Sequence, residues 1–294
     1  MSKSVIEITT MIGCPNACVY CPQDNLRGSY IDKSKKIMNL QEFNFFLSQI
    51  DIPMDIHFSG YSEPFVVPDA VKMVEVSFDQ GFDVGIATTL RGLKVEDFKL
   101  FLNKKFKFFT VHMPDQDGLM KFRIDDFFLK LLEESTKISG VDYLVMGQID
   151  PRTAKIIGSE VASTKNLTDR GGNISLTEIP ISIKDDFHKP INFSGPLYCE
   201  KRPLVDQFVL LPNGTITLCN ADYGMKHVLG NLMENKMSEI ICGKPFIQIK
   251  KAMLGENNID LLCRTCRNAA PLSKKDIFLT KIKRTIGLQH KVSS

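Results

Sequence analysis

The sequence predicts an α/β protein, a partial (β/α)6 barrel followed by a small α+β domain. From about Ser4 to Ile183, apolar and β-branched runs alternate with segments of helical period. After about Pro190 this alternation gives way to a hairpin pattern and paired cysteines. Six strands suit an open or incomplete barrel better than a closed one of eight. We therefore expect a barrel over residues 1–190, a second domain over 191–270 and a basic tail over 271–294.

The barrel prediction depends on strands and helices that alternate along the chain. Strands are expected within residues 4–10, 54–60, 82–89, 106–113, 141–149 and 173–181, and helices within 39–50, 69–81, 95–103, 124–138 and after Asp150. Such alternation indicates a parallel sheet with right-handed crossovers. In the second domain, residues 207–219 ("QFVLLPNGTITLC") predict a hairpin, and residues 238–254 predict a helix. In barrels of this kind the chemistry takes place at the C-terminal ends of the strands.

Composition narrows the class of protein. The chain has 294 residues, 43% of them hydrophobic and 24% charged, with a net charge of +3, so neither disorder nor a nucleic-acid partner is indicated. The polar start "MSKSVIEITT" lacks the apolar core of a signal peptide, and there is no run of about 18 apolar residues. A cytoplasmic location is expected. In that compartment the eight cysteines are better explained as metal ligands than as disulfides.

Three cysteines lie within eight residues directly after the first predicted strand. Cys14, Cys18 and Cys21 form the segment "CPNACVYC". A structural zinc site needs four protein ligands, and the nearest histidine is His57. An iron–sulfur cube bound by three cysteines would instead keep one iron open to a substrate. The cluster is the favoured interpretation, and zinc is the alternative.

The C-x3-C-x2-C spacing, with an aromatic residue before the third cysteine, resembles the radical S-adenosylmethionine (SAM) enzymes. In that superfamily the methionine amine and carboxylate of SAM bind the open iron of a 4Fe-4S cluster. The resemblance implies that Cys14, Cys18 and Cys21 are the cluster ligands. It also implies that Tyr20 lies near the adenine of SAM.

Two further segments resemble the same superfamily. "FSGYSEP" is similar to its "GGEP" segment, which implies that Glu63 accepts a hydrogen bond from the methionine ammonium. Gly60 would then let the backbone approach closely, and Ser62 stands where the second glycine is usual. In "ATTLRG", Thr88 and Thr89 occupy the place from which the superfamily often contacts the SAM ribose.

The second half of the chain resembles the C-terminal SPASM and twitch extensions of radical SAM enzymes. Four cysteines suit the shorter twitch form, so the resemblance implies one auxiliary 4Fe-4S cluster on Cys199, Cys219, Cys263 and Cys266. A zinc ribbon is the alternative for this set. The remaining Cys242 is expected to be a buried apolar side chain, with a catalytic role as hydrogen donor as the alternative.

The implied activity is reductive cleavage of SAM to a 5'-deoxyadenosyl radical, which takes a hydrogen atom from the substrate. The layout is most similar to the aminocyclitol dehydrogenases of the superfamily, so we expect oxidation of an alcohol in a small, hydroxylated metabolite. "TDRGGN" resembles an element of relatives in which Arg170 would contact the SAM carboxylate or a polar substrate; a simple glycine turn is the alternative. The expected partners are this substrate and an electron donor such as flavodoxin or ferredoxin.

Three other functions stay open at this stage. An epimerase would need a hydrogen donor, for which Cys242 is the available thiol. A peptide maturase commonly has a leader-binding domain before the barrel, whereas here the first strand begins at about Ser4. A non-catalytic iron–sulfur or zinc module would need no Glu63. The tail from Lys274 to Lys291 is expected to be an amphipathic helix packed on the domain rather than bound to a membrane.

Overall fold

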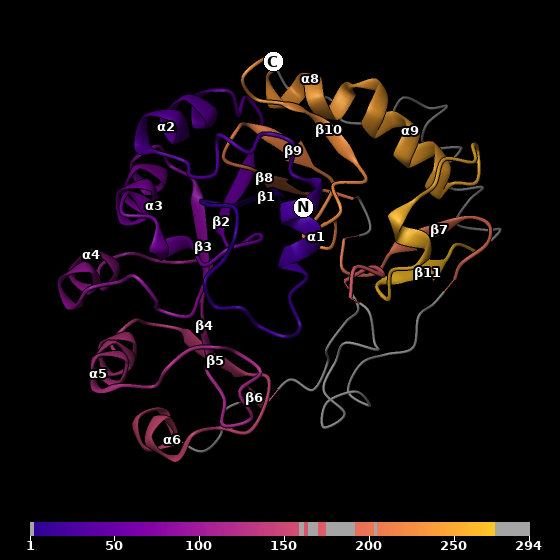
Figure 1. The fold of residues 1–294 in the computed structure, drawn as a ribbon. Coiled ribbons are helices and arrows are strands. Elements are labelled where there is room, and N and C mark those ends of the chain that lie inside the picture. Colours follow the sequence, from indigo (N-terminus) through magenta and orange to yellow (C-terminus); the bar gives the residue numbers. More distant parts are fainter. Residues whose placement is uncertain (1–2, 159–161, 164–169, 175–191, 203–204, 274–294) are drawn as a thin grey trace.

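The computed structural model describes residues 3–158, 162–163, 170–174, 192–202 and 205–273 (Figure 1). The strands in this part are β1 (Ser4–Ile8), β2 (Met54–Phe58), β3 (Asp83–Thr88), β4 (Phe108–Met113), β5 (Val141–Val145), β6 (Ala162–Ser163), β7 (Leu197–Cys199), β8 (Gln207–Leu210), β9 (Thr215–Thr217), β10 (Val228–Asn231) and β11 (Ala269–Pro271). The helices are α1 (Gln23–Ser29), α2 (Leu40–Ser48), α3 (Ala70–Asp79), α4 (Phe98–Phe101), α5 (Asp126–Ser135), α6 (Pro151–Ile157), α8 (Met237–Cys242) and α9 (Lys244–Met253). Short 3-10 turns are η1 (Pro64–Val66), η2 (Val95–Asp97) and η3 (Leu262–Arg264).

One sheet carries most of the fold. Its strand order is β10-β9-β8-β1-β2-β3-β4-β5-β6, and β1 to β6 pair in parallel with their neighbours. Helices α2 to α6 follow one another along the outer side of the strands (Figure 1). The predicted partial barrel with parallel strands is confirmed.

Local sequence signals explain where the outer helices begin. Asn39 caps α2 with a capping box, in which its side chain accepts a hydrogen bond from the Glu42 amide (2.9 Å) and Glu42 accepts one from the Asn39 amide (3.0 Å). Asp125 caps α5 by accepting from the Phe128 amide (2.9 Å). The apolar faces of these helices pack on the outer face of the sheet, where Ile6 and Ile8 of β1 are fully buried. The opposite face of the sheet carries buried polar side chains such as Glu7 and His57 together with apolar ones such as Val209.

The C-terminal part adds to this sheet at β1. β8 pairs in parallel with β1, from Val5↔Gln207 to Ile8↔Leu210, and β9 and β10 continue the sheet in antiparallel order. The predicted hairpin at 207–219 is therefore present, but its strands extend the barrel sheet. A separate two-stranded sheet joins β7 to β11 beside the cysteines of this part.

One expectation about the elements needs correction, and three others lie wholly or mostly outside the described residues. The single helix expected over 238–254 is two helices, α8 and α9, because Gly243 ends the first and Pro245 stands in the first turn of the second. Most of the strand expected over 173–181, the domain boundary near residue 190 and the tail from Lys274 lie outside the described residues, and the sixth strand that is described is β6. Within the described ranges, no helix is long and apolar enough to cross a membrane.

The loop after β3 contains a glycine whose replacement tests how tightly this end of the sheet is packed. Gly92 has a φ of +93°, and a Cβ there would lie 2.1 Å from the carbonyl oxygen of Phe65 in η1. Gly81 has a similar φ of +82° but open space around the Cβ position. Gly81→Ala should cost about 1 kcal/mol of unfolding free energy for the left-handed backbone alone. Gly92→Ala should cost a further ~2 kcal/mol for the clash. Equal losses in urea unfolding of the two variants would contradict this packing.

Candidate functional site

The loop after β1 carries the first three cysteines to the rim of a cavity of about 150 Å3. Gln23 in α1 fixes this loop, because its side chain accepts a hydrogen bond from the Cys14 amide (3.1 Å) and donates one to the carbonyl of Tyr61 (2.6 Å). Ala17, in the middle of the loop, has a positive φ of 45°, a conformation in which tertiary contacts must hold a non-glycine residue. The loop is thus tied to the segment that follows β2.

The three thiols share one environment. Burial is the main cause that raises the pKa of Cys14 to about 11 and of Cys18 to about 12, and the neighbouring Cys21 contributes to both values. Thiols with such pKa values are protonated at neutral pH when no metal is bound. Because thiolates are the metal-binding form, a metal or cluster bound here would displace their protons.

Every residue predicted to bind the first cluster or SAM lines this same cavity. The set comprises Cys14, Cys18, Tyr20, Cys21, Gly60, Ser62, Glu63, Thr88 and Thr89. The hydroxyl of Tyr20 is buried, and the side chain of Cys18 is its neighbour in the cavity. The sequence prediction thus identified residues that the fold brings together from three strand ends.

Glu63 is buried and accepts four hydrogen bonds from the protein. The hydroxyl of Thr88 (2.6 Å) and the amide of Phe65 (3.3 Å) donate to Oε1, and the amide (2.6 Å) and hydroxyl (2.8 Å) of Thr89 donate to Oε2. Burial raises the pKa of this carboxyl, and the hydrogen bonds from the two threonines oppose the rise. In this state Thr88 and Thr89 orient Glu63, a contact that the sequence analysis had not assigned to them.

Gly60 has a positive φ of +70°, and the close approach expected of its backbone is to the protein itself. A Cβ at Gly60 would lie 2.5 Å from the hydroxyl of Thr9, just after β1. The Gly60 amide donates to the buried carboxylate of Glu7 (3.1 Å). Gly60 therefore serves to pack the loop after β2 against β1.

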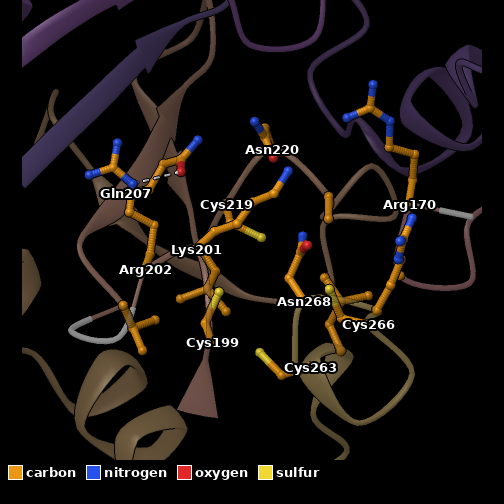
Figure 2. A pocket seen from close by; sticks show the side chains of 16 residues that line it. Arg170, Cys199, Lys201, Arg202, Gln207, Cys219, Asn220, Cys263, Cys266 and Asn268 are labelled. Carbon is orange, nitrogen blue, oxygen red and sulfur yellow. Dashed lines mark hydrogen bonds between the residues drawn. The ribbon is translucent and has the colours of Figure 1, made fainter. Parts of the chain in front are cut away.

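The other four predicted ligands line a second, larger cavity of about 460 Å3. Figure 2 shows Cys199 on β7, Cys219 after β9, and Cys263 and Cys266 from the loop around η3. Burial, with smaller contributions from Cys266 and Cys199, raises the pKa of Cys263 to about 12. Burial and then Cys263 and Cys266 also raise the pKa of Cys219. The predicted set of four is thus placed around one space.

The larger cavity also has a basic lining. Arg170, Lys201, Arg202 and Arg267 all contribute to it, together with the amides of Gln207, Asn220 and Asn268 (Figure 2). Arg202 donates to the side chain of Gln207 (3.2 Å). Lys201 and Arg267 have no hydrogen bond or ion pair with the described part of the chain. Positive charge is therefore available in this cavity for a cluster with its thiolates or for an anionic ligand.

Arg170 is the residue that lines both cavities. Its backbone has a positive φ of 50°, consistent with the glycine-rich turn in which it stands. Burial opposes its charge, but Tyr223, Cys21 and Glu7 raise its pKa above the usual value, so Arg170 stays cationic. The structure thus places Arg170 between the two cysteine sets.

The sequence analysis did not predict that His112 and Tyr223 line the smaller cavity. His112, near the end of β4, has a pKa lowered to about 4 by burial and by Arg170, so its imidazole is neutral at pH 7. Tyr223 comes from the C-terminal part, and its hydroxyl lies 3.3 Å from the sulfur of Cys21. The position of His112 at a strand end was a usable signal. Nothing in the sequence around Tyr223 indicates a contact with a cysteine 202 residues earlier.

The expectation of burial for Cys242 is wrong. Cys242 ends α8 and is exposed, because the helix turns Met237 and Ile240 toward the core instead. It lines neither of the two cavities.

The donor sets fit iron–sulfur clusters. Among the described residues, no group of three or more His, Cys, Asp or Glu is arranged to hold a single metal ion. The cysteines instead surround two cavities, three around one and four around the other. Cysteine thiolates in sets of three or four are the ligands that 4Fe-4S clusters take.

One known protein family matches the C-terminal part of the chain. Residues 199–267 match the model of the SPASM family, an iron–sulfur cluster-binding domain. The matched SPASM segment begins at Cys199 and includes all four predicted auxiliary ligands. No curated protein matches the chain.

Solved structures share the fold over nearly the whole chain. BtrN in complex with AdoMet and 2-DOIA is 19% identical with a TM-score of 0.59, covering 93% of this chain and 96% of that one. anSMEcpe with AdoMet and the Cp18Cys peptide is 14% identical (TM-score 0.51, 97% and 98% covered). SuiB of Streptococcus suis with the precursor peptide SuiA is 12% identical (TM-score 0.55, 90% and 70% covered).

These similarities show the fold, a partial barrel followed by a small C-terminal part, and residues 199–267 of that part are similar to an iron–sulfur cluster-binding domain. The SPASM match agrees with an iron–sulfur cluster on the four C-terminal cysteines.

The two cysteine sets predict how cluster content responds to substitution. Anaerobically reconstituted protein should contain two 4Fe-4S clusters, and the variant with Cys14, Cys18 and Cys21 all changed to alanine should retain one. Iron and sulfide analysis measures both values. The Cys242→Ala variant is the matched control and should retain two. Zinc bound at Cys263 and Cys266 would contradict the auxiliary cluster.

Proposed function

We propose that this protein is a radical SAM enzyme that oxidises an alcohol of a small polar metabolite. The observation that carries the proposal is the pairing of two cavities, one lined by three cysteines and the other by four, which meet at Arg170. The three-cysteine cavity also contains the glutamate and threonine side chains expected of a SAM site. The SPASM match at residues 199–267 supports a cluster in the other.

Cys14, Cys18 and Cys21 would hold the first cluster, and Cys199, Cys219, Cys263 and Cys266 the auxiliary one. When bound, the first cluster supplies the electron that cleaves SAM to methionine and a 5'-deoxyadenosyl radical. The protein orients the cofactor through Glu63, whose carboxylate faces the same cavity as the cysteines. Arg170 supplies a cation for the SAM carboxylate or for the substrate.

The position of Cys242 favours oxidation over epimerisation. An epimerase must return a hydrogen atom to the substrate, and Cys242 is the cysteine left over from the two ligand sets. Its exposed place at the end of α8, outside both cavity linings, does not suit that task. Oxidation needs an electron acceptor, and a cluster held by Cys199, Cys219, Cys263 and Cys266 would be suited to be one.

The lining of the larger cavity supports a polar substrate. Lys201, Arg202 and Arg267 offer cations, and Asn220 and Asn268 offer amide donors and acceptors. BtrN was solved with a small molecule, 2-DOIA, whereas anSMEcpe and SuiB were solved with peptides. Peptide modification is therefore the second candidate function, favoured by the similarity to anSMEcpe and SuiB. A reducing partner such as flavodoxin or ferredoxin, and a cytoplasmic location, are parts of this proposal.

Glu63→Gln tests the SAM site. Loss of the carboxylate charge should weaken SAM binding by about 1 to 3 kcal/mol, since the ammonium would lose a charge-assisted hydrogen bond. Calorimetry on cluster-loaded protein measures the change. Asp55→Asn is the control, because Asp55 is similarly buried on β2 but lines neither cavity. Unchanged affinity in Glu63→Gln, with both clusters intact, would remove Glu63 from the site.

Product analysis in deuterated water tests the reaction. With candidate alcohol substrates, oxidation should give a carbonyl product without deuterium at the reacting carbon, and Cys242→Ala should stay fully active. Mass spectrometry and NMR of the product provide the measurement. A product of unchanged oxidation state with one deuterium at that carbon, together with loss of turnover in Cys242→Ala, would make the protein an epimerase instead.

A further inference from the structure

Tyr223 belongs to the SPASM domain but reaches a ligand of the other cysteine set. It lies four residues after Cys219, and its hydroxyl is 3.3 Å from the sulfur of Cys21. The side chain is buried, with 3% of its surface exposed. Cys21 has a second neighbour of this kind, Gln23, whose side-chain amide donates to the same sulfur at 3.4 Å. One donor to Cys21 thus comes from the barrel and the other from the SPASM domain.

The turn that carries Tyr223 is fixed on both sides. The amide of Asp222 donates to the Cys219 carbonyl (3.1 Å), and the Asp222 carboxylate accepts from the amides of Lys226 and His227 (2.8 Å each). His227 in turn accepts from the amide of Leu262, next to Cys263 (2.9 Å). The position of Tyr223 is therefore tied to two segments that carry auxiliary ligands.

Tyr61 holds the ring of Tyr223 from the barrel side. The two ring centroids are 4.5 Å apart with an interplanar angle of 52°, and Tyr61 is 1% exposed. The Tyr61 hydroxyl donates to the carbonyl of Cys219 (2.7 Å). A continuous series of contacts thus runs from Cys21 through Tyr223 and Tyr61 to Cys219.

We infer that Tyr223 is a positioning residue that tunes the first cluster by donating a hydrogen bond to the Cys21 thiolate. A thiolate has no proton to donate, and a phenol is protonated at neutral pH, so the direction of the bond is fixed once Cys21 is a ligand. Hydrogen bonds to cluster sulfurs stabilise the additional negative charge of the reduced cluster and raise its reduction potential. The SPASM domain thereby sets how readily the first cluster takes up an electron.

This inference rests on the proposed function, since it requires a cluster on Cys14, Cys18 and Cys21. The test is an anaerobic potentiometric titration of reconstituted protein, followed by electron paramagnetic resonance. In Tyr223→Phe the reduction equilibrium of the first cluster should become about tenfold less favourable, which for one electron is a midpoint ~59 mV more negative. The phenylalanine ring would keep the stacking on Tyr61, so the thermal unfolding temperature should not change.

Tyr30→Phe is the matched control. Tyr30 is buried in the same apolar cluster as Tyr61 and Tyr223, but its hydroxyl donates to the carbonyl of Lys35. Its replacement should leave the midpoint of the first cluster unchanged. Equal midpoints in wild type and Tyr223→Phe, with iron content intact in both, would overturn the inference and leave the proposed function standing. Wild-type protein without a cluster on the first three cysteines would overturn both.

A measurement on wild-type protein covers the case in which Tyr223→Phe does not load its cluster. Electron–nuclear double resonance of the reduced first cluster should detect an exchangeable proton near Cys21 that disappears in deuterated water. The Gln23 amide donates to the same sulfur and the Glu63 amide donates to the sulfur of Cys14, so three inequivalent exchangeable protons are expected, and in 15N-labelled protein only the Tyr223 proton lacks a bonded 15N nucleus. Absence of an exchangeable proton without a bonded 15N nucleus would overturn the inference.

Discussion

The parallel pairing of β8 with β1 is the constraint on which the arrangement of the site depends. β1 leads into the loop with the first three cysteines, and β8 leads through its hairpin to Cys219. The contacts between the barrel and the C-terminal part depend on this register, because they are made by side chains near the ends of the paired strands. Glu7 of β1 illustrates this, since it accepts hydrogen bonds from Gln207 of β8, Asn220 and Gly60. Strand register thus places the two cysteine sets side by side.

Buried polar groups at this junction are satisfied by partners from distant parts of the chain. The carboxylate of Glu7 would be costly to bury without its three donors, and Glu63 would be equally costly without Thr88 and Thr89. Each of these networks joins the ends of two or more strands. These networks hold the strand ends that line the cavities in place.

Much of the fold and of the first site could be predicted from the sequence, because local patterns determine them. Strand and helix periods predicted β1 to β5 and the outer helices, and the spacing of Cys14, Cys18 and Cys21 in one loop identified a cluster-type ligand set. The fusion of β8 to β1 could not be predicted in the same way, since sheet pairing between segments as distant as Val5 and Gln207 has no local signature. The exposure of Cys242 was missed because a six-residue helix leaves its orientation to tertiary packing.

Contacts between distant parts of the chain could not be predicted from the sequence. Glu63 was predicted to bind the methionine ammonium of SAM and Thr88 its ribose, whereas in the fold Thr88 donates a hydrogen bond of 2.6 Å to Glu63. Tyr223 received no role, although the fold directs its hydroxyl to Cys21. In both cases the residue type was visible and its partner was not. A motif therefore identifies which groups a site contains, while the three-dimensional arrangement decides which of them act on the cofactor and which act on one another.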